Sequence, residues 1–164
     1  MFDPIQIQDE LVKWMQEFVE QPNPLLGNWA PCPYARKARI NNNIEILFFD
    51  DPSAGIEKSI SAINYGKEVA VVCFDHTKIS ASELVEFVKN INQQLMPDYV
   101  VLEDHPDNVE HVNGVKMNFG LCGLLVIQRL DQLNTASDQL KSKGYYDHWD
   151  QTALDSVVSW RRTQ

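Results

Sequence analysis

Three hydrophobic runs in the sequence end in acidic residues and histidine. They cover residues 44–49, 69–74 and 99–102, and Asp50-Asp51, Asp75-His76 and Glu103-Asp104-His105 follow them in turn. Runs of about six β-branched and aromatic residues, separated by helical patterns, predict buried strands of a parallel sheet. The carboxyl ends of parallel strands line up along one edge of an open sheet, where ligands usually bind. The pattern therefore predicts a polar site at that edge, with Asp50, Asp75 and Glu103 or Asp104 along it.

The segments around these runs have helical periodicity and helix-capping residues. Asp3-Pro4 predicts a helix start, and Ser80-Ala81-Ser82-Glu83 is a capping box. Helices are expected over about residues 4–20, 52–65, 80–95, 130–140 and 150–160, with a fourth strand at residues 124–127. This order predicts one α/β domain over residues 1–164, built on a single open, mainly parallel twisted sheet of about four strands with flanking helices. A thioredoxin-like arrangement is the alternative, because its order of elements also matches.

Composition and charge narrow the classes of function. The chain has 164 residues, 44% of them hydrophobic, and a net charge of −9. Such an acidic surface repels nucleic acid and anionic lipid, so neither partner is expected. No run approaches the roughly 20 apolar residues of a membrane span, and the acidic N-terminus does not have the pattern of a signal peptide. Three widely spaced cysteines favour free thiols in the cytoplasm over a disulfide framework.

The segment after the third strand is rich in carboxylates and imidazoles. Residues 103–111 read Glu-Asp-His-Pro-Asp-Asn-Val-Glu-His. Such groups can bind a divalent transition metal, or act as acid and base when their pKa values differ. The candidate metal ligands are His76, His105, His111, Asp107 and Glu110, with His105 as the central one. The alternative is that the acids cap helices and turns, which is common for Asp and Asn.

Cys32 is the second candidate for chemistry, in the segment Pro31-Cys32-Pro33-Tyr34-Ala35. Pro33 fits the first position of a short helix, which would make Cys32 its N-cap. Free backbone N–H groups and three following cations would then lower the pKa of the thiol. The segment resembles the Cys-Pro-Tyr-Cys site of glutaredoxins, but Ala35 replaces the second cysteine. The alternative is that Cys32 packs as a small hydrophobic residue.

Several short motifs also occur in a defined order along the chain. Trp14, Cys32-Pro33-Tyr34-Ala35-Arg36, His105-Pro106-Asp107 and a strand ending in Arg129 resemble an uncharacterised bacterial protein family with Cys-Pro-Phe-Ala and His-Pro-Asp motifs, a domain of unknown function. The resemblance covers about residues 10–140. It implies that Cys32, Arg36, His105, Asp107 and Arg129 share one site.

Two classes of function follow from these observations. The first is a small cytoplasmic enzyme that acts on a small anionic or polar metabolite. Arg36, Lys37 and Arg129 would hold the anion beside Asp104, His105 would act as acid or base with Asp107, and Cys32 would be the nucleophile or a ligand. The second is a non-enzymatic binding or adaptor module whose acidic face meets a basic partner. Proximity of Cys32 and His105 in one concave pocket would favour the enzyme.

Overall fold

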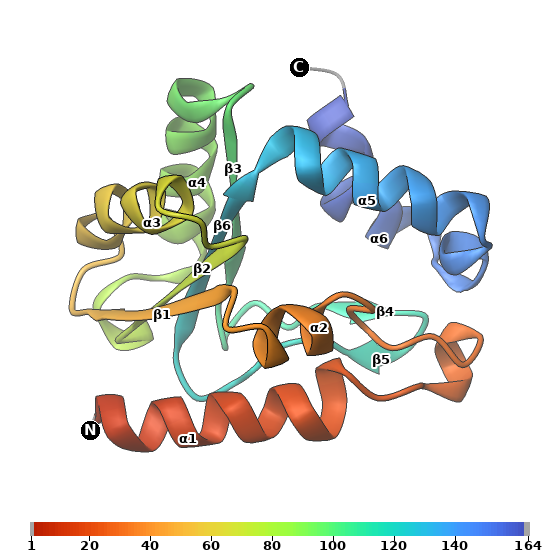
Figure 1. Ribbon diagram of the computed structural model, residues 1–164. Helices are drawn as coiled ribbons and strands as arrows, with labels where there is room; N and C mark the ends of the chain where they lie inside the picture. Colours follow the sequence, from red (N-terminus) through yellow and green to blue (C-terminus); the bar gives the residue numbers. More distant parts are fainter. Residues whose placement is uncertain (1, 163–164) are drawn as a thin grey trace.

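The protein is an α/β structure with one central four-stranded sheet (Figure 1). The computed structural model describes residues 2–162. The strands of the main sheet are β1 (Ile44–Phe49), β2 (Val69–Phe74), β3 (Tyr99–Asp104) and β6 (Gly123–Arg129). The α-helices are α1 (Pro4–Trp14), α2 (Ala35–Ile40), α3 (Ala54–Asn64), α4 (Ala81–Leu95), α5 (Leu130–Ser142) and α6 (Gln151–Val157). These elements confirm the predicted open α/β fold.

Shorter elements connect the helices and strands. A π-helical turn, Met15–Val19, continues α1, and 3-10 turns cover Pro24–Leu26, His76–Lys78, Tyr145–His148 and Ser159–Arg162. The hairpin of β4 (His111–Val112) and β5 (Val115–Lys116) lies in the segment between β3 and β6. The sequence analysis expects no strand in that segment, because two-residue strands are too short to give a periodic pattern.

The helix starts follow the capping signals in the sequence. The Asp3 carboxylate accepts a hydrogen bond from the Ile5 N–H, and Pro4 occupies the first turn of α1. Ser80 and Glu83 form the complete capping box of α4. Each cap satisfies backbone N–H groups that have no partner within the helix.

The order of strands across the sheet is β1-β2-β6-β3. β1 and β2 are parallel, while β6 is antiparallel to both of its neighbours, β2 and β3. β1, β2 and β3 therefore run in the same direction, and β6 runs against them. The sheet is mixed, and three of its four strands still end at the same edge.

Helices cover the two faces of the sheet with apolar side chains. On one face, α3 and α4 bury a cluster around Val72, Phe74, Leu84, Val101 and Leu125. On the other, α1 packs over Val71, Cys73, Leu124 and the neighbouring residues of β1. Close approach at the end of β2 requires Gly123, since a Cβ there would lie 2.2 Å from the Phe74 ring. Within residues 2–162, no helix is both long enough and apolar enough to cross a membrane.

Candidate functional site

The carboxyl ends of β1, β2 and β3 meet at one edge of the sheet, as the sequence predicts. Phe49 is paired with Phe74 in the register of β1 and β2, and Phe74 lies opposite Gly123. Asp104 lies opposite Leu124, the next residue of β6. The acidic residues that end or follow the three strands therefore lie at this edge. We refer to it as the acidic edge.

At the ends of β1 and β2, the acidic side chains stabilise their own turns. Asp51 accepts hydrogen bonds from the hydroxyl and the N–H of Ser53, and Asp75 accepts the equivalent bonds from Thr77. These bonds lower the pKa of both carboxyl groups. Asp50 is exposed and lies 3.6 Å from the Lys78 ammonium. This part of the acidic edge matches the capping alternative.

The end of β3 is different, because three carboxylates interact there without an ion pair. They are Glu103, Asp104 and Glu110, which we call the β3 cluster. Burial raises the pKa of both Glu103 and Asp104. Glu110 reaches solvent, yet desolvation by the surrounding protein and the nearby charges of Glu103 and Asp104 raise its pKa to about 7. None of the ion pairs found within residues 2–162 includes a member of this cluster.

Asn118, a buried residue between β5 and β6, organises the β3 cluster. Its side-chain N–H₂ group donates to Asp104 Oδ1 at 2.6 Å and to the carbonyls of His105 and Asn108. Its amide oxygen accepts the Glu110 backbone N–H at 2.7 Å. The second Asp104 oxygen accepts the Phe119 N–H at 2.9 Å. The network fixes the backbone that carries the three carboxylates.

His105 connects the end of β3 to the segment after β2. Its Nε2 lies 2.8 Å from the Ile79 carbonyl and 3.3 Å from that of His76, so this nitrogen carries the proton and donates. Its Nδ1 accepts the Asp107 backbone N–H at 3.1 Å. The ring is 2% exposed, so both nitrogens are occupied by backbone partners away from bulk solvent. In this arrangement His105 positions two loops.

The predicted metal ligands do not come together. His76 stacks edge-on against His105, with ring centroids 5.6 Å apart, while His111 lies exposed in β4. Asp107 is exposed and its carboxylate lies 4.0 Å from His105 Nδ1. In the part of the chain that the structure describes, no group of three or more His, Cys, Asp or Glu side chains is placed to hold a metal ion. The physical reason at His105 is that the lone pair on Nδ1 already accepts a backbone N–H.

Cys32 lies in a different environment from the one that its sequence predicted. Helix α2 begins only at Ala35, with Tyr34 as its N-cap residue, so Cys32 precedes the helix. Cys32 is exposed, but protein atoms surround the sulfur, and this desolvation raises the pKa of the thiol. The backbone N–H groups of Tyr34 and Ala35 lower it, and the Glu20 charge raises it further. The prediction of a lowered pKa is therefore wrong.

The neighbours of Cys32 belong to the loop before α2 and to the segment after α5. Its N–H donates to the Val19 carbonyl at 3.0 Å, and the Tyr145 hydroxyl donates to the carbonyl of Pro31. Burial is the main reason that the pKa of Tyr145 is raised, and the Cys32 charge adds to it. His105, by contrast, contacts His76, Ile79 and Asp107. Within residues 2–162, Cys32 and His105 share no interaction partner.

The predicted anion-binding cations are also separate from the acidic edge. Arg36 and Lys37 are exposed on α2. Arg129 lies opposite Tyr99 at the start of β3, five residues along β6 from the partner of Asp104, or about 17 Å away. There its guanidinium covers the Tyr99 ring and donates to the Asn64 side chain at 2.8 Å. Cys32, Arg36, His105, Asp107 and Arg129 thus lie in at least three regions.

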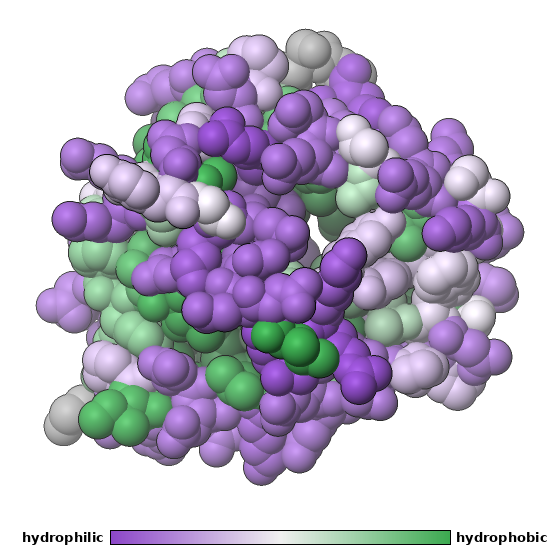
Figure 2. Space-filling view, in the orientation of Figure 1, coloured by the Kyte–Doolittle hydropathy of each residue, from purple (hydrophilic) through white to green (hydrophobic). Residues whose placement is uncertain are grey.

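A shallow cavity of about 260 Å³ lies between Tyr34 and one face of α5, near the hollow at the centre of the molecule (Figure 2). Asp131, Gln132, Thr135, Ala136 and Gln139 line it, and the Tyr34 hydroxyl bridges it to Gln139 at 3.3 Å. It contains none of the predicted site residues. The β3 cluster remains the strongest candidate site.

One member of this site, Asn118, was not among the predicted site residues, and nothing local in the sequence shows that its side chain reaches back to β3. Glu110 was expected as a metal ligand, but its interaction with Glu103 depends on how the chain folds back over seven residues. Comparison with protein families, with curated proteins and with solved structures finds no match to this chain.

Proposed function

We propose that this protein is a binding module whose β3 cluster receives a basic side chain from a partner. The observation that carries the proposal is a group of three carboxylates that forms no ion pair with a basic side chain of residues 2–162. Desolvation, together with the charges of Glu103 and Asp104, raises the pKa of Glu110 to about 7, so the ionised form of the cluster is electrostatically unfavourable. A lysine or arginine from a partner stabilises this form when it binds. The partner class is a basic protein or peptide.

Charge elsewhere on the molecule supports the same class of partner. The net charge of −9 attracts cationic partners over a range of about 10 Å at moderate salt. Lys116, in the hairpin beside the cluster, is one of the groups whose charge lowers the pKa of Asp104. A partner cation therefore meets three carboxylates and one ammonium group at this position.

The test is a titration with a short arginine-rich peptide, followed by calorimetry at low salt. We expect Glu110→Gln to weaken binding about tenfold, while Glu86→Gln, which removes the same charge from the exposed face of α4, changes it little. Binding to the natural protein should be stronger at pH 8 than at pH 6, because Glu110 loses its proton across that range. Equal losses in both variants, or no pH step, would exclude the β3 cluster as the site.

An enzyme that uses Cys32 is the second candidate, and it is favoured because Cys32 is the exposed one of the three cysteines. Cys73 and Cys122 are buried, and their hydrogen bond to each other, with burial, raises the pKa of Cys122. We expect iodoacetamide to modify Cys32 first, and Cys32→Ser to remove this fast phase. The raised pKa predicts a rate at neutral pH below that of a free cysteine. A rate above that of free cysteine would favour the enzyme, and reaction of Cys32 last would remove it.

A further inference from the structure

β1 forms an open outer edge of the main sheet. It is the first strand in the order β1-β2-β6-β3, and among the described residues it pairs only with β2. Its sequence is Ile-Glu-Ile-Leu-Phe-Phe, and all six residues are half-exposed. A long apolar edge strand with free backbone groups readily pairs with another strand, and proteins usually block it.

The opposite edge of the same sheet is blocked. The buried side chain of Asn92 on α4 donates to the Val101 carbonyl at 2.9 Å and accepts the Val101 N–H at 2.8 Å. It therefore occupies both backbone groups in the middle of β3 where another strand would bind. Among residues 2–162, no side chain performs this role at β1, so the two edges differ in kind.

The register shows which groups of β1 are free. The Asn43 carbonyl accepts the Val69 N–H at 3.2 Å, and Ile44 lies opposite Val69. In a parallel pair, backbone groups point alternately toward and away from the neighbouring strand. Glu45, Leu47 and Phe49 therefore bond to β2. The N–H and C=O groups of Ile44, Ile46 and Phe48 point outward, and no hydrogen bond in the described part of the chain satisfies them.

The surface beside this edge is hollowed. A cavity of about 230 Å³ lies between α1 and the first half of β1, and its lining mixes apolar side chains, such as Ile44 and Ile46, with polar ones, such as Arg39 and Glu45. Ile40, at the end of α2, is 61% exposed, and Ile5 on α1 is 78% exposed. Figure 2 shows hydrophobic surface gathered over this side of the molecule, around α1 and β1.

We propose that the outer edge of β1 pairs with β1 of a second copy of this chain, antiparallel, with Ile46 on the two-fold axis. This register places Ile44 opposite Phe48 of the second copy, and Ile46 opposite Ile46. All three outward-facing residues of each strand are then used, and each pair exchanges two hydrogen bonds. A shift by two residues in either direction leaves one of the three unpaired. The result is one continuous eight-stranded sheet.

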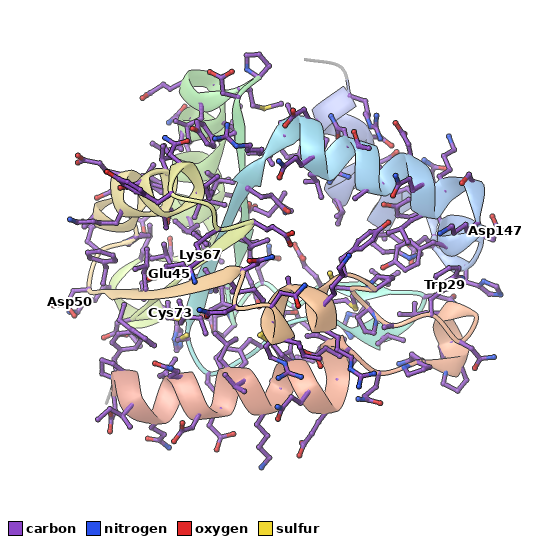
Figure 3. The ribbon with its side chains drawn as sticks, viewed as in Figure 1. Trp29, Glu45, Asp50, Lys67, Cys73 and Asp147 are labelled. Atoms are coloured by element: carbon purple, nitrogen blue, oxygen red, sulfur yellow. The ribbon has the colours of Figure 1, made fainter. Side chains whose placement is uncertain are left out.

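The charges along β1 favour this antiparallel pairing. In the proposed register Asp50 faces Asn42 of the second copy, and in each chain the Lys67 ammonium lies 2.7 Å from the Asn42 carbonyl. Lys67 is also 3.6 Å from Glu45, and Asp50 lies at the far end of the strand with its side chain 81% exposed (Figure 3). Antiparallel pairing brings Asp50 of one copy to Lys67 of the other at both ends. A parallel arrangement would instead place Asp50 beside Asp50.

Sedimentation equilibrium of the full chain tests the association, and amide hydrogen exchange tests the register. We expect a monomer–dimer equilibrium in which the N–H groups of Ile44, Ile46 and Phe48 gain protection as concentration rises. The N–H groups of Glu45, Leu47 and Phe49 should be protected at every concentration, because they bond to β2. A chain that stays monomeric, or one that dimerises without this alternation, would overturn the proposal. A monomer that instead binds an extended peptide at β1 would also overturn it.

A charge exchange locates the interface without disturbing the strand. Asp50→Lys and Lys67→Glu should each weaken the dimer about tenfold, and the double variant should recover most of the loss. Within its own chain, Asp50→Lys removes a 3.6 Å pair with Lys78, and Lys67→Glu removes a 3.6 Å pair with Glu45 and the hydrogen bond to the Asn42 carbonyl. Lys141→Glu on α5 is the matched control and should have no effect.

Ile46→Pro, which removes an outward N–H, should abolish the dimer and keep the monomer folded. If the charge exchange shows no recovery, the interface lies elsewhere. None of these changes touches the β3 cluster, so peptide binding there tests the proposed function independently.

Discussion

The acidic edge has two halves that look alike in sequence and behave in opposite ways. At the ends of β1 and β2, Asp51 and Asp75 accept hydrogen bonds from the turn that follows, and their pKa values are lowered. At the end of β3, desolvation raises the pKa values of Glu103, Asp104 and Glu110. The charges of Glu103 and Asp104 raise the pKa of Glu110 further. A carboxylate after a strand is therefore a cap where a local donor satisfies it. Where the chain returns with further carboxylates, desolvation and their charges raise the pKa instead.

Removal of the Asn118 side chain should have the largest effect, because it connects the β3 cluster to the loop. Asn118→Ala leaves the half-buried Asp104 without one donor and the Glu110 N–H without its acceptor. We expect the free energy of unfolding in urea to fall by about 3 kcal/mol. Asn90→Ala, at an exposed position of α4, is the control and should be close to neutral. A loss below about 1 kcal/mol would mean that water replaces these bonds at little cost.

The pH dependence of stability separates the two halves by sign. The pKa of Glu110 is 4.5 in the unfolded chain and about 7 in the folded protein. Between these values the folded state holds a proton that the unfolded state has released, so stability falls as pH rises from 5 to 8. The expected fall is about 1 kcal/mol, reduced for solvent screening because Glu110 is exposed.

Glu110→Gln tests this assignment directly. The variant should be flat over the same pH range and more stable than the natural protein at pH 8. Urea unfolding at a series of pH values measures both curves. If the slope persists in the variant, another group is responsible for it.

Asp75 should produce the smallest effect and the opposite sign. Its lowered pKa contributes stability that is present above the ordinary value of 3.8 and is lost as pH falls through the folded value. Asp75→Ala removes the bonds to Thr77 and should cost roughly 0.5 kcal/mol at pH 7, at the low end for a cap. The variant should also lose less stability than the natural protein between pH 5 and pH 3. Equal acid sensitivity in both proteins would show that the Thr77 bonds do not hold the carboxylate in solution.

Local pattern was sufficient for most of the fold. Apolar runs predicted the four strands of the main sheet, and helical spacings predicted five of the α-helices. The Ser80–Glu83 capping box appears as expected. These features depend on residues within one or two turns of each other, where backbone geometry and hydrophobic period act directly. The sequence also predicted that three strands end at one edge of the sheet, because this requires only that the strands share a direction.

Long-range placement decided the rest. β6 enters the sheet between β2 and β3, which no local signal specifies. Cys32, His105 and Arg129 were expected in one site, but the fold separates them because each is held by partners close to its own segment. The raised pKa of Cys32 likewise comes from desolvation of its sulfur by surrounding protein atoms, which its neighbours in sequence do not indicate.

By itself, the sequence determined which segments become strands and helices and which residues follow them, since those depend on short-range periodicity and capping. Only the tertiary structure decided what these residues can do. It brought Glu110 back to Glu103 and Asp104, occupied both nitrogens of His105, and blocked the edge of β3 with Asn92 while leaving β1 open. The physical reason is that a pKa, a free lone pair and an unpaired backbone group depend on every atom nearby in space, most of which are distant along the chain.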